Sequence, residues 1–432
     1  MPGPSEMSDF CEADAQTRAY RWWVVAMLWL VCFANYADRQ AIFSIFPPLQ
    51  QEFSLSRVQL GALGSAFMWV YALAGPCAGW LSDRLSRRTI LLAALLFWSL
   101  CTAATAIAHG YTALLICRAL GGLGEAFYFP AAISLIADYH GRTTRSRAMA
   151  LHQSAVYAGS IAGGALTAWL AARHGWRQPF LLFGAFGLLL AAVLFLGLRE
   201  PARGAADRAK GGPSALRTPG TLISLLRNQP AWTLALVFIA ANFVAAIFLS
   251  WTPAFLYEKF HMSLTLAGFS GTAWLQLASI VGVIAGGVLA DRLVKRSSGG
   301  RIYAQAVGLA LGVPFLIATG QASTAIGVTC ALLGFGLAKG IYDANIWASL
   351  YDVVPLRDRG VAVGVMNSLA WIGGGVATIV VAATSTRFGF STCLSASSIL
   401  YALPAVALLL LGRWLTGLGS IKTGTHADPS TR

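Results

Sequence analysis

Long apolar runs separated by short polar segments form the main pattern of this sequence. Each run is close to or longer than the roughly 20 residues that a helix needs to cross the hydrocarbon core of a bilayer. The pattern therefore predicts an all-α, polytopic membrane protein with 12 transmembrane helices. The predicted spans cover residues 22–46, 58–81, 89–108, 112–139, 148–172, 179–198, 231–257, 265–293, 302–320, 325–353, 360–386 and 391–414.

The composition supports this prediction, because 57% of the 432 residues are hydrophobic and only 11% are charged. A soluble domain carries about a quarter charged residues. The net charge of +14 would fit nucleic acid binding, but the distribution of the basic residues indicates a membrane topology instead. Of the 31 Lys and Arg residues, 23 lie in the tails and loops of one side and five in the loops of the other. By the positive-inside rule, both termini are cytoplasmic in a cell (plasma or inner) membrane.

An internal repeat divides the chain into two halves. The segment from Gly336 to Asp352, GLAKGIYDANIWASLYD, aligns with the segment from Gly122 to Asp138 at an offset of 214 residues. Duplicated halves of this kind are typical of transporters whose site lies between the repeats. The sequence predicts two pseudo-symmetric six-helix bundles. We expect a cytoplasmic N-tail at 1–21, a first bundle at 22–198, a cytoplasmic linker at 199–230, a second bundle at 231–415 and a cytoplasmic C-tail at 416–432.

Six charged residues lie inside the predicted spans, well away from the span ends, which is costly in a bilayer and usually marks a substrate or proton path. They are three acids and three bases: Asp38, Glu125, Asp343, Arg39, Arg118 and Lys339. Arg118 and Glu125 are seven residues apart, about two helical turns, and so share one helix face. Lys339 and Asp343 are spaced to form a pair within one helix. The alternative is a set of buried ion pairs that join helices, but such pairs are weak stabilisers.

The charges suggest a transport chemistry. Protonation of Asp38 or Glu125 would leave the site positive and favour an organic anion, and loss of the proton would weaken that anion's hold. We therefore predict proton coupling at Asp38 and Glu125. The predicted substrate-binding residues are Arg39, Arg118, Lys339, Tyr36, Tyr128, Tyr342, Asp343 and Asn367.

A second duplicated motif closes two spans. The pattern G-x-x-x-D-R-x-x-[RK]-R starts at Gly79 and again at Gly287. It resembles the signature loop of the major facilitator superfamily, in which the Asp caps a neighbouring helix and the basic residues latch the cytoplasmic side. The predicted cytoplasmic gate consists of Asp83, Arg84, Arg88, Asp138, Asp291, Arg292 and Asp352.

Nearly the whole chain resembles a major facilitator transporter, and the anion:cation symporter group most closely. The similarity lies in Asn35-Tyr36-Ala37-Asp38-Arg39 and in the segments 55–84, 124–131 and 250–256. This resemblance implies symport of a sugar acid or another carboxylate with protons by alternating access. Spinster-like transporters, which share the Asp-Arg and Glu positions, imply proton-linked movement of a lysolipid or amphiphile.

Other functions fit the sequence less well. A drug:proton antiporter would have a Gly-Pro in the fifth span, where this chain reads Gly159-Ser160 and then Gly163-Gly164. The HExxH, GxSxG and Walker A patterns do not occur, so we do not expect an enzyme. We expect no cofactor and no metal site. The expected partners are a small anion, protons and the lipid bilayer, with no nucleic acid, and the expected state is a monomer.

Overall fold

The computed structural model describes residues 4–82, 84–141, 143–202, 227–297, 299–355 and 358–424. Its described part consists of helices joined by short connections. The helices of the first half are α1 (Pro4–Ser44), α2 (Phe46–Phe53), α3 (Arg57–Ser82), α4 (Arg87–Thr105), α5 (Tyr111–Ala126), α6 (Tyr128–Tyr139), α7 (Arg145–His174) and α8 (Arg177–Gly197). Those of the second half are α11 (Gln229–Phe260), α12 (Leu264–Val294), α13 (Gly300–Gln321), α14 (Ala325–Asp343), α15 (Ile346–Val353), α16 (Arg359–Ala396) and α17 (Ile399–Gly424).

The helices confirm the predicted all-α, polytopic fold. Ten stretches of the described residues are long and apolar enough to cross a membrane, and one of them, Arg359–Gly417, covers both α16 and α17. Gly389 divides that stretch, because its φ of 77° is not helical. Counting that stretch as two, together with α1, which contains the first predicted span, gives the twelve predicted spans. The fourth and tenth spans are each interrupted, by Phe127 between α5 and α6 and by Ala344 and Asn345 between α14 and α15.

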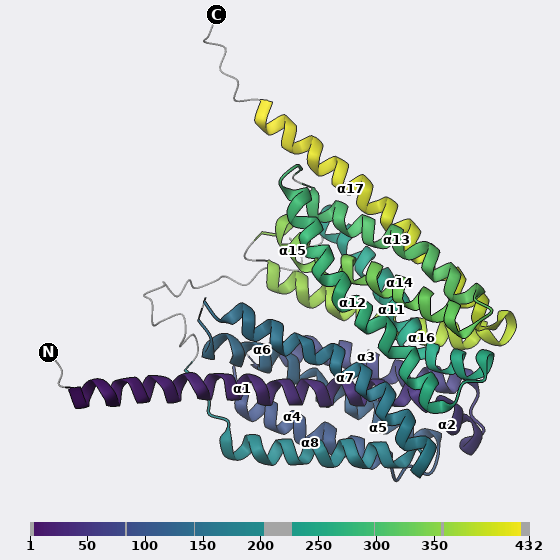
Figure 1. Cartoon of the computed structure of the whole chain (residues 1–432), viewed down its shortest axis with the longest axis horizontal. Helices are drawn as coiled ribbons and strands as arrows, with labels where there is room; N and C mark the ends of the chain where they lie inside the picture. Colours follow the sequence, from purple (N-terminus) through teal and green to yellow (C-terminus); the bar gives the residue numbers. More distant parts are fainter. Residues whose placement is uncertain are drawn as a thin grey trace, which may run out of the picture.

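Figure 1 shows the helices of the two halves as two groups that lie close together at one end and diverge toward the other. The diverging end is the one where α1 begins and α17 ends, and we call it the terminal end. The end where α3 begins is called the opposite end. The two groups meet through α3 and α16 and through α7 and α12.

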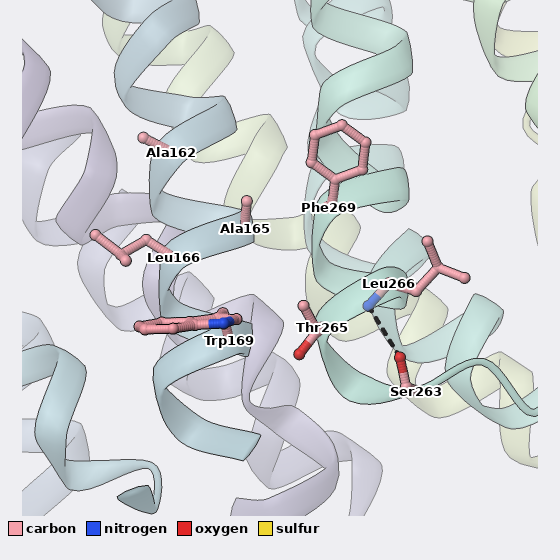
Figure 2. A pocket seen from close by; sticks show the side chains of 8 residues that line it. All are labelled: Ala162, Ala165, Leu166, Trp169, Ser263, Thr265, Leu266 and Phe269. Atoms are coloured by element: carbon pink, nitrogen blue, oxygen red, sulfur yellow. Dashed lines mark hydrogen bonds between the residues drawn. The ribbon is translucent and has the colours of Figure 1, made fainter. Parts of the chain in front are cut away.

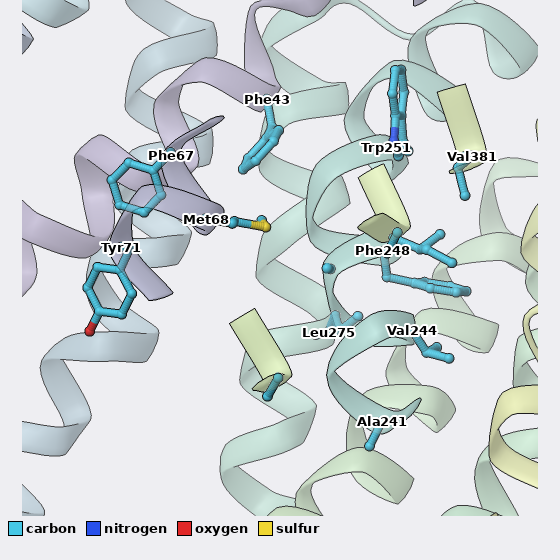
Figure 3. Packing of buried hydrophobic residues seen from close by; sticks show 14 of the residues in the cluster. Phe43, Phe67, Met68, Tyr71, Ala241, Val244, Phe248, Trp251, Leu275 and Val381 are labelled. Carbon is cyan, nitrogen blue, oxygen red and sulfur yellow. The ribbon is translucent and has the colours of Figure 1, made fainter. Parts of the chain in front are cut away.

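The halves touch near the opposite end. Ser65 Oγ on α3 donates a hydrogen bond of 2.6 Å to the carbonyl of Gly375 on α16, and Trp69 Nε1 donates one of 3.1 Å to the carbonyl of Ile372. Figure 3 shows buried apolar side chains of both halves, among them Met68 on α3, Trp251 on α11 and Val381 on α16. Nearer the terminal end, a Cβ built on Gly79 or Gly360 would meet no atom within 4 Å. The halves therefore touch at the opposite end, and their helices diverge toward the terminal end (Figure 1).

Close helix contacts hold the first half together and depend on glycine. A Cβ at Gly163 on α7 would lie 2.6 Å from the Cα of Ala37 on α1, far inside normal contact distance. We expect Gly163→Ala to force the two helices apart and to destabilise the protein by about 1–3 kcal/mol, the usual cost of overpacking. Thermal unfolding in detergent measures this loss. Gly79→Ala is the matched control, and an equal melting temperature for both variants would contradict the packing.

Candidate functional site

A buried ion pair joins α1 to α5 inside the first half. Arg39 Nε donates to Glu125 Oε2 at 2.6 Å, and the Glu125 side chain is 0% exposed. Glu125 lies in the last turn of α5, next to the interruption at Phe127. Gly122, one turn before it, allows α5 to approach the backbone of α3 at Phe67 closely. Gly122 thus allows α5 to pack closely against α3, and the ring centre of Phe67 on α3 lies 5.3 Å from the Cζ of Arg39.

The other two predicted charges of the first half lie beside this pair. Asp38 accepts a hydrogen bond of 2.8 Å from Thr102 Oγ1 on α4. Arg118 is 3% exposed and lies close enough to Asp38 and Glu125 to interact with both electrostatically. We call these four residues, Asp38, Arg39, Arg118 and Glu125, the N-half cluster. With all four ionised, its net charge is zero.

Aromatic rings surround the arginines. The Cζ of Arg39 lies 4.7 Å from the ring centre of Tyr36 and 4.5 Å from that of Tyr71, and the Cζ of Arg118 lies 4.6 Å from the ring of Phe67. One ring comes from the second half, since Trp371 on α16 lies 5.2 Å from the Cζ of Arg39. Cation–π contacts stabilise a desolvated cation while leaving its N–H groups available.

Several polar atoms of the cluster have no hydrogen-bond partner among the described residues. They are Arg39 Nη1, Arg118 Nε and Glu125 Oε1. Both side-chain polar atoms of the nearby sequence neighbour Asn35 are also buried without a hydrogen-bond partner among the described residues. A buried polar atom without a partner costs about 1–3 kcal/mol. Two arginine donors and a carboxylate oxygen within one buried cluster can bind a carboxylate or exchange a proton.

The second half contains a separate charged pair. Lys339 Nζ contacts Asp343 Oδ2 one turn later on α14, which confirms the predicted pairing within one helix. Tyr157 on α7 of the first half is close enough to interact with both charges electrostatically. Tyr342 is buried in the same region. We call Lys339 and Asp343 the C-half pair.

Two of the predicted binding residues lie elsewhere. Tyr128 donates from its hydroxyl to the carbonyl of Leu28 at 2.7 Å and lies 2.7 Å from His152 Nε2. Because the hydroxyl has one hydrogen and a carbonyl only accepts, His152 must donate through Nε2 to the Tyr128 oxygen. Tyr128 thus has both partners within the first half. Asn367 is half-buried on α16, one turn before Trp371.

Two ion pairs at the terminal end occupy equivalent positions in the two halves. The acid of each pair was predicted from the sequence, but the arginine was not. Asp138 pairs with Arg87 at the start of α4, and Asp352 pairs with Arg301 at the start of α13 through two hydrogen bonds of 2.7 and 2.9 Å. Arg87 and Arg301 are 214 residues apart, the same offset as Asp138 and Asp352. That shared offset was the signal that would have identified both arginines.

Glu200 reinforces the pair of the first half. It follows α8 and accepts hydrogen bonds from Arg87 Nε at 2.9 Å and from the backbone N–H of Arg88 at 2.7 Å. Burial raises the pKa of Glu200, but hydrogen bonds from Arg87 and Arg88 outweigh it, so the pKa lies below its usual value. Glu200 therefore stays ionised at neutral pH and anchors the start of α4.

The other predicted gate residues that the structure describes are not assigned to an ion pair here. Asp83 lies outside the described residues. The Cζ of Arg84 lies 3.9 Å from the ring centre of Trp80, and Arg88 Nη2 donates to the carbonyl of Phe195 at 2.6 Å. Asp291 and Arg292 are exposed at the end of α12.

At the opposite end, an ion pair that we did not predict connects the halves. Arg57 Nη2, at the start of α3, donates to Glu258 Oε2 on α11 at 2.6 Å. Its Nη1 lies 3.3 Å from the carbonyl of Ser385 on α16, and its Cζ lies 4.5 Å from the ring of Phe390. We call Arg57 and Glu258 the opposite-end latch.

Comparisons with known proteins agree with this architecture. The family model of the Major Facilitator Superfamily matches residues 28–378. The hexuronate transporter of Bacillus subtilis (strain 168) is 27% identical over 363 residues, covering 80% of this chain and 84% of that protein. The probable galactarate/D-glucarate transporter GudP of the same organism is 28% identical over 388 residues, covering 83% of each.

A solved structure has the same fold. It is a bacterial homologue of the human lysosomal transporter Spinster in an inward-facing, unoccupied conformation. Its TM-score is 0.82 at 24% identity, and the match covers 92% of this chain and 98% of that one. At this level of identity the likeness concerns the fold.

Proposed function

The chain belongs to the major facilitator superfamily, and on that premise we propose that it carries a small organic anion across a membrane together with protons. The chain is thus a transporter and not an enzyme. The observation that carries the proposal is the buried Arg39–Glu125 pair, which lies under Trp371 of the other half. A charged pair at membrane depth is expensive, and buried pairs add little stability, so a transport role accounts for it better than a structural one.

The coupling follows from charge balance in the N-half cluster. A proton on Glu125 removes its attraction for Arg39, which then has its Nε and its unpartnered Nη1 available for an anion. Arg118 adds a second guanidinium, and planar guanidinium groups bind carboxylates through paired hydrogen bonds. When the proton leaves, the carboxylate of Glu125 competes again for Arg39 and the anion is released. Asp38, held by Thr102, is the second acid that can take up a proton.

The nature of the anion is supported by the relatives. Those described above are named for hexuronate and for galactarate or D-glucarate, which are all sugar acids. The same substrate class fits a site with two arginines, several aromatic rings and the phenol of Tyr36, because sugar hydroxyls need hydrogen-bonding partners and sugar rings stack on aromatic faces. A sugar acid is therefore the substrate class that we assign.

Alternating access follows from the way the halves meet. They touch at the opposite end and diverge toward the terminal end (Figure 1), so the site is approached from the terminal end. The excess of basic residues at that end supports a cytoplasmic location for it. The transport cycle then requires the opposite-end contacts to break and the repeated ion pairs of the terminal end to come together between the halves.

The opposite-end latch gives a first prediction. Exposed ion pairs and cation–π contacts each contribute roughly 0.5–1 kcal/mol, so Arg57→Gln should raise the population of the form open at that end several-fold. Hydrogen exchange of the peptides spanning 57–69 and 371–385 should speed up in the variant. Arg173→Gln, at the same end but stacked only on Trp169, is the control. Unchanged exchange in Arg57→Gln would show that the latch does not hold the halves together.

Transport by the purified protein in liposomes tests the function. D-galacturonate and D-glucarate should accumulate above equilibrium when the outside is acidic, and a protonophore should abolish the accumulation. Uptake that ignores the pH gradient would refute proton coupling. Uptake of neither acid would refute the assigned substrate class.

A second candidate is a proton-linked carrier of lysolipids or other amphiphiles, and one observation favours it. A groove of about 510 Å³ opens between α7 and α12, where the two halves meet. Figure 2 shows Leu166, Trp169, Leu266 and Phe269 around it, so the lining is mostly apolar. Binding of lysophosphatidylcholine to the purified protein, lost in Trp169→Ala and insensitive to Arg39→Ala, would favour this function over anion transport.

A further inference from the structure

The C-half pair is a second polar site, distinct from the N-half cluster. Among the described residues, the groups that interact with Lys339 are Asp343 and Tyr157, and neither belongs to that cluster. Tyr157 comes from α7 of the first half, so the pair faces the boundary between the halves. The side chains of Lys339 and Asp343 are 14% and 27% exposed, which leaves both within reach of a solute.

Buried polar groups lie near the pair, among packed aromatic rings. The hydroxyls of Tyr342 and Tyr401 are buried without a hydrogen-bond partner among the described residues, and both rings lie close enough to Asp343 to interact with its charge. A lysine ammonium has three N–H donors, and one of them meets Asp343. The Lys339 side chain is 14% exposed, so the other two donors are the ones that a second acceptor would use.

The N-half cluster and the C-half pair each have a net charge of zero when all their side chains are ionised. The N-half cluster has two arginines and two acids, and the C-half pair has one lysine and one acid. A carboxylate with two oxygens is satisfied by the arginines of the N-half cluster alone. A monocarboxylate would therefore leave Lys339 without a role, whereas a substrate with two acidic ends would use both sites and connect the two halves.

We propose that the substrate is a dicarboxylate, with one carboxylate on Arg39 and Arg118 and the other on Lys339. This rests on the proposed function and narrows its substrate class. Asp343 competes with the second carboxylate for Lys339, as Glu125 competes with the first for Arg39. The bridging substrate contacts both halves and so favours the arrangement in which they close around it.

Two substitutions with opposite expected effects test the proposal. Lys339→Gln removes the second cation and should weaken the binding of D-glucarate, a dicarboxylate, at least about 10-fold, the value of a hydrogen bond to a charged group. Asp343→Asn removes the competitor and should tighten it. Binding of D-galacturonate, which has a single carboxylate, should change less than about twofold in both variants. Binding to the purified full-length protein is measured by calorimetry.

Folding and function are separated in the same experiment. The double variant Lys339→Gln/Asp343→Asn keeps the shape of the pair without its charges, and it should bind D-glucarate as weakly as Lys339→Gln while melting near the unchanged protein. Equal losses for both acids in Lys339→Gln, or weaker D-glucarate binding in Asp343→Asn, would overturn the dicarboxylate assignment. If the unchanged protein binds neither acid, the proposed function itself fails.

Discussion

Glu125→Gln should exchange substrate across the membrane but fail to accumulate it. The amide oxygen can still accept from Arg39, so the shape of the site is kept, but the side chain can no longer release a proton at any working pH. Arg39 then remains available to the anion on both sides of the membrane. Exchange of labelled D-glucarate between equal concentrations in liposomes should continue, while uptake driven by a pH gradient should fall to the equilibrium level.

The comparison of the two assays excludes a trivial loss of protein. Unfolded or poorly inserted Glu125→Gln would lose exchange as well as accumulation. Asp138→Asn is a useful control, because this acid pairs with Arg87 at the terminal end, away from the N-half cluster. Gradient-driven accumulation by Glu125→Gln at the level of the unchanged protein would show that this residue does not couple protons to transport.

Arg39→Ala should lose most anion binding. The guanidinium supplies two donors toward the proposed anion and is held by Tyr36, Tyr71 and Trp371, so its removal eliminates both the charge and the order of the site. At about 1.5–3 kcal/mol for a hydrogen bond between charged groups, the dissociation constant should rise roughly 10- to 100-fold. Calorimetric titration with D-galacturonate measures it.

Arg118→Ala should weaken binding in the same direction, and Arg84→Ala should not. Arg84 is stacked on Trp80 near the terminal end, outside the N-half cluster, and so controls for the loss of one positive charge. Equal affinity in the unchanged protein and in both Arg39→Ala and Arg118→Ala would mean that the ligand is not held by its charge. That result would favour the amphiphile carrier.

Much of the fold was predictable because each membrane span is determined by a continuous hydrophobic run in the sequence. The hydrophobic runs gave all twelve spans, and only the kinks near Phe127 and Asn345 were missed, since a helix interrupted for one or two residues keeps its apolar pattern. Gly389 shows the opposite case. The break between the last two spans rests on a single left-handed residue, yet polar Arg387 beside it already indicated a loop.

The site was harder to predict because its contacts join distant parts of the chain. The high free energy of placing a charged side chain inside a bilayer was enough to identify Asp38, Arg39, Arg118 and Glu125. The pairing of Arg39 with Glu125, 86 residues apart, could not be derived from spacing. Only the Lys339–Asp343 pair, four residues apart, had a spacing that fixed its partner.

Ion pairs outside the predicted spans or near their ends were missed from the sequence for a different reason. The opposite-end latch joins Arg57 to Glu258, two residues at helix ends outside the predicted spans, where isolated charges are ordinary. Arg87 and Arg301 lie in basic segments that the positive-inside rule already explains, so nothing but the shared offset of the repeat singled them out. A charged residue indicates a function from the sequence alone only where charges are rare, as inside a membrane span. These residues lie where charges are common, so the sequence did not single them out.

Proton uptake on substrate binding tests the central claim most directly. The purified protein in weakly buffered detergent solution, with a pH indicator, is mixed with D-glucarate, and Glu125→Gln is treated in the same way. If the anion and a proton bind together at the N-half cluster, the unchanged protein takes up protons as it binds the acid, and Glu125→Gln takes up fewer. Binding without proton uptake, or identical uptake by the two proteins, would contradict the account.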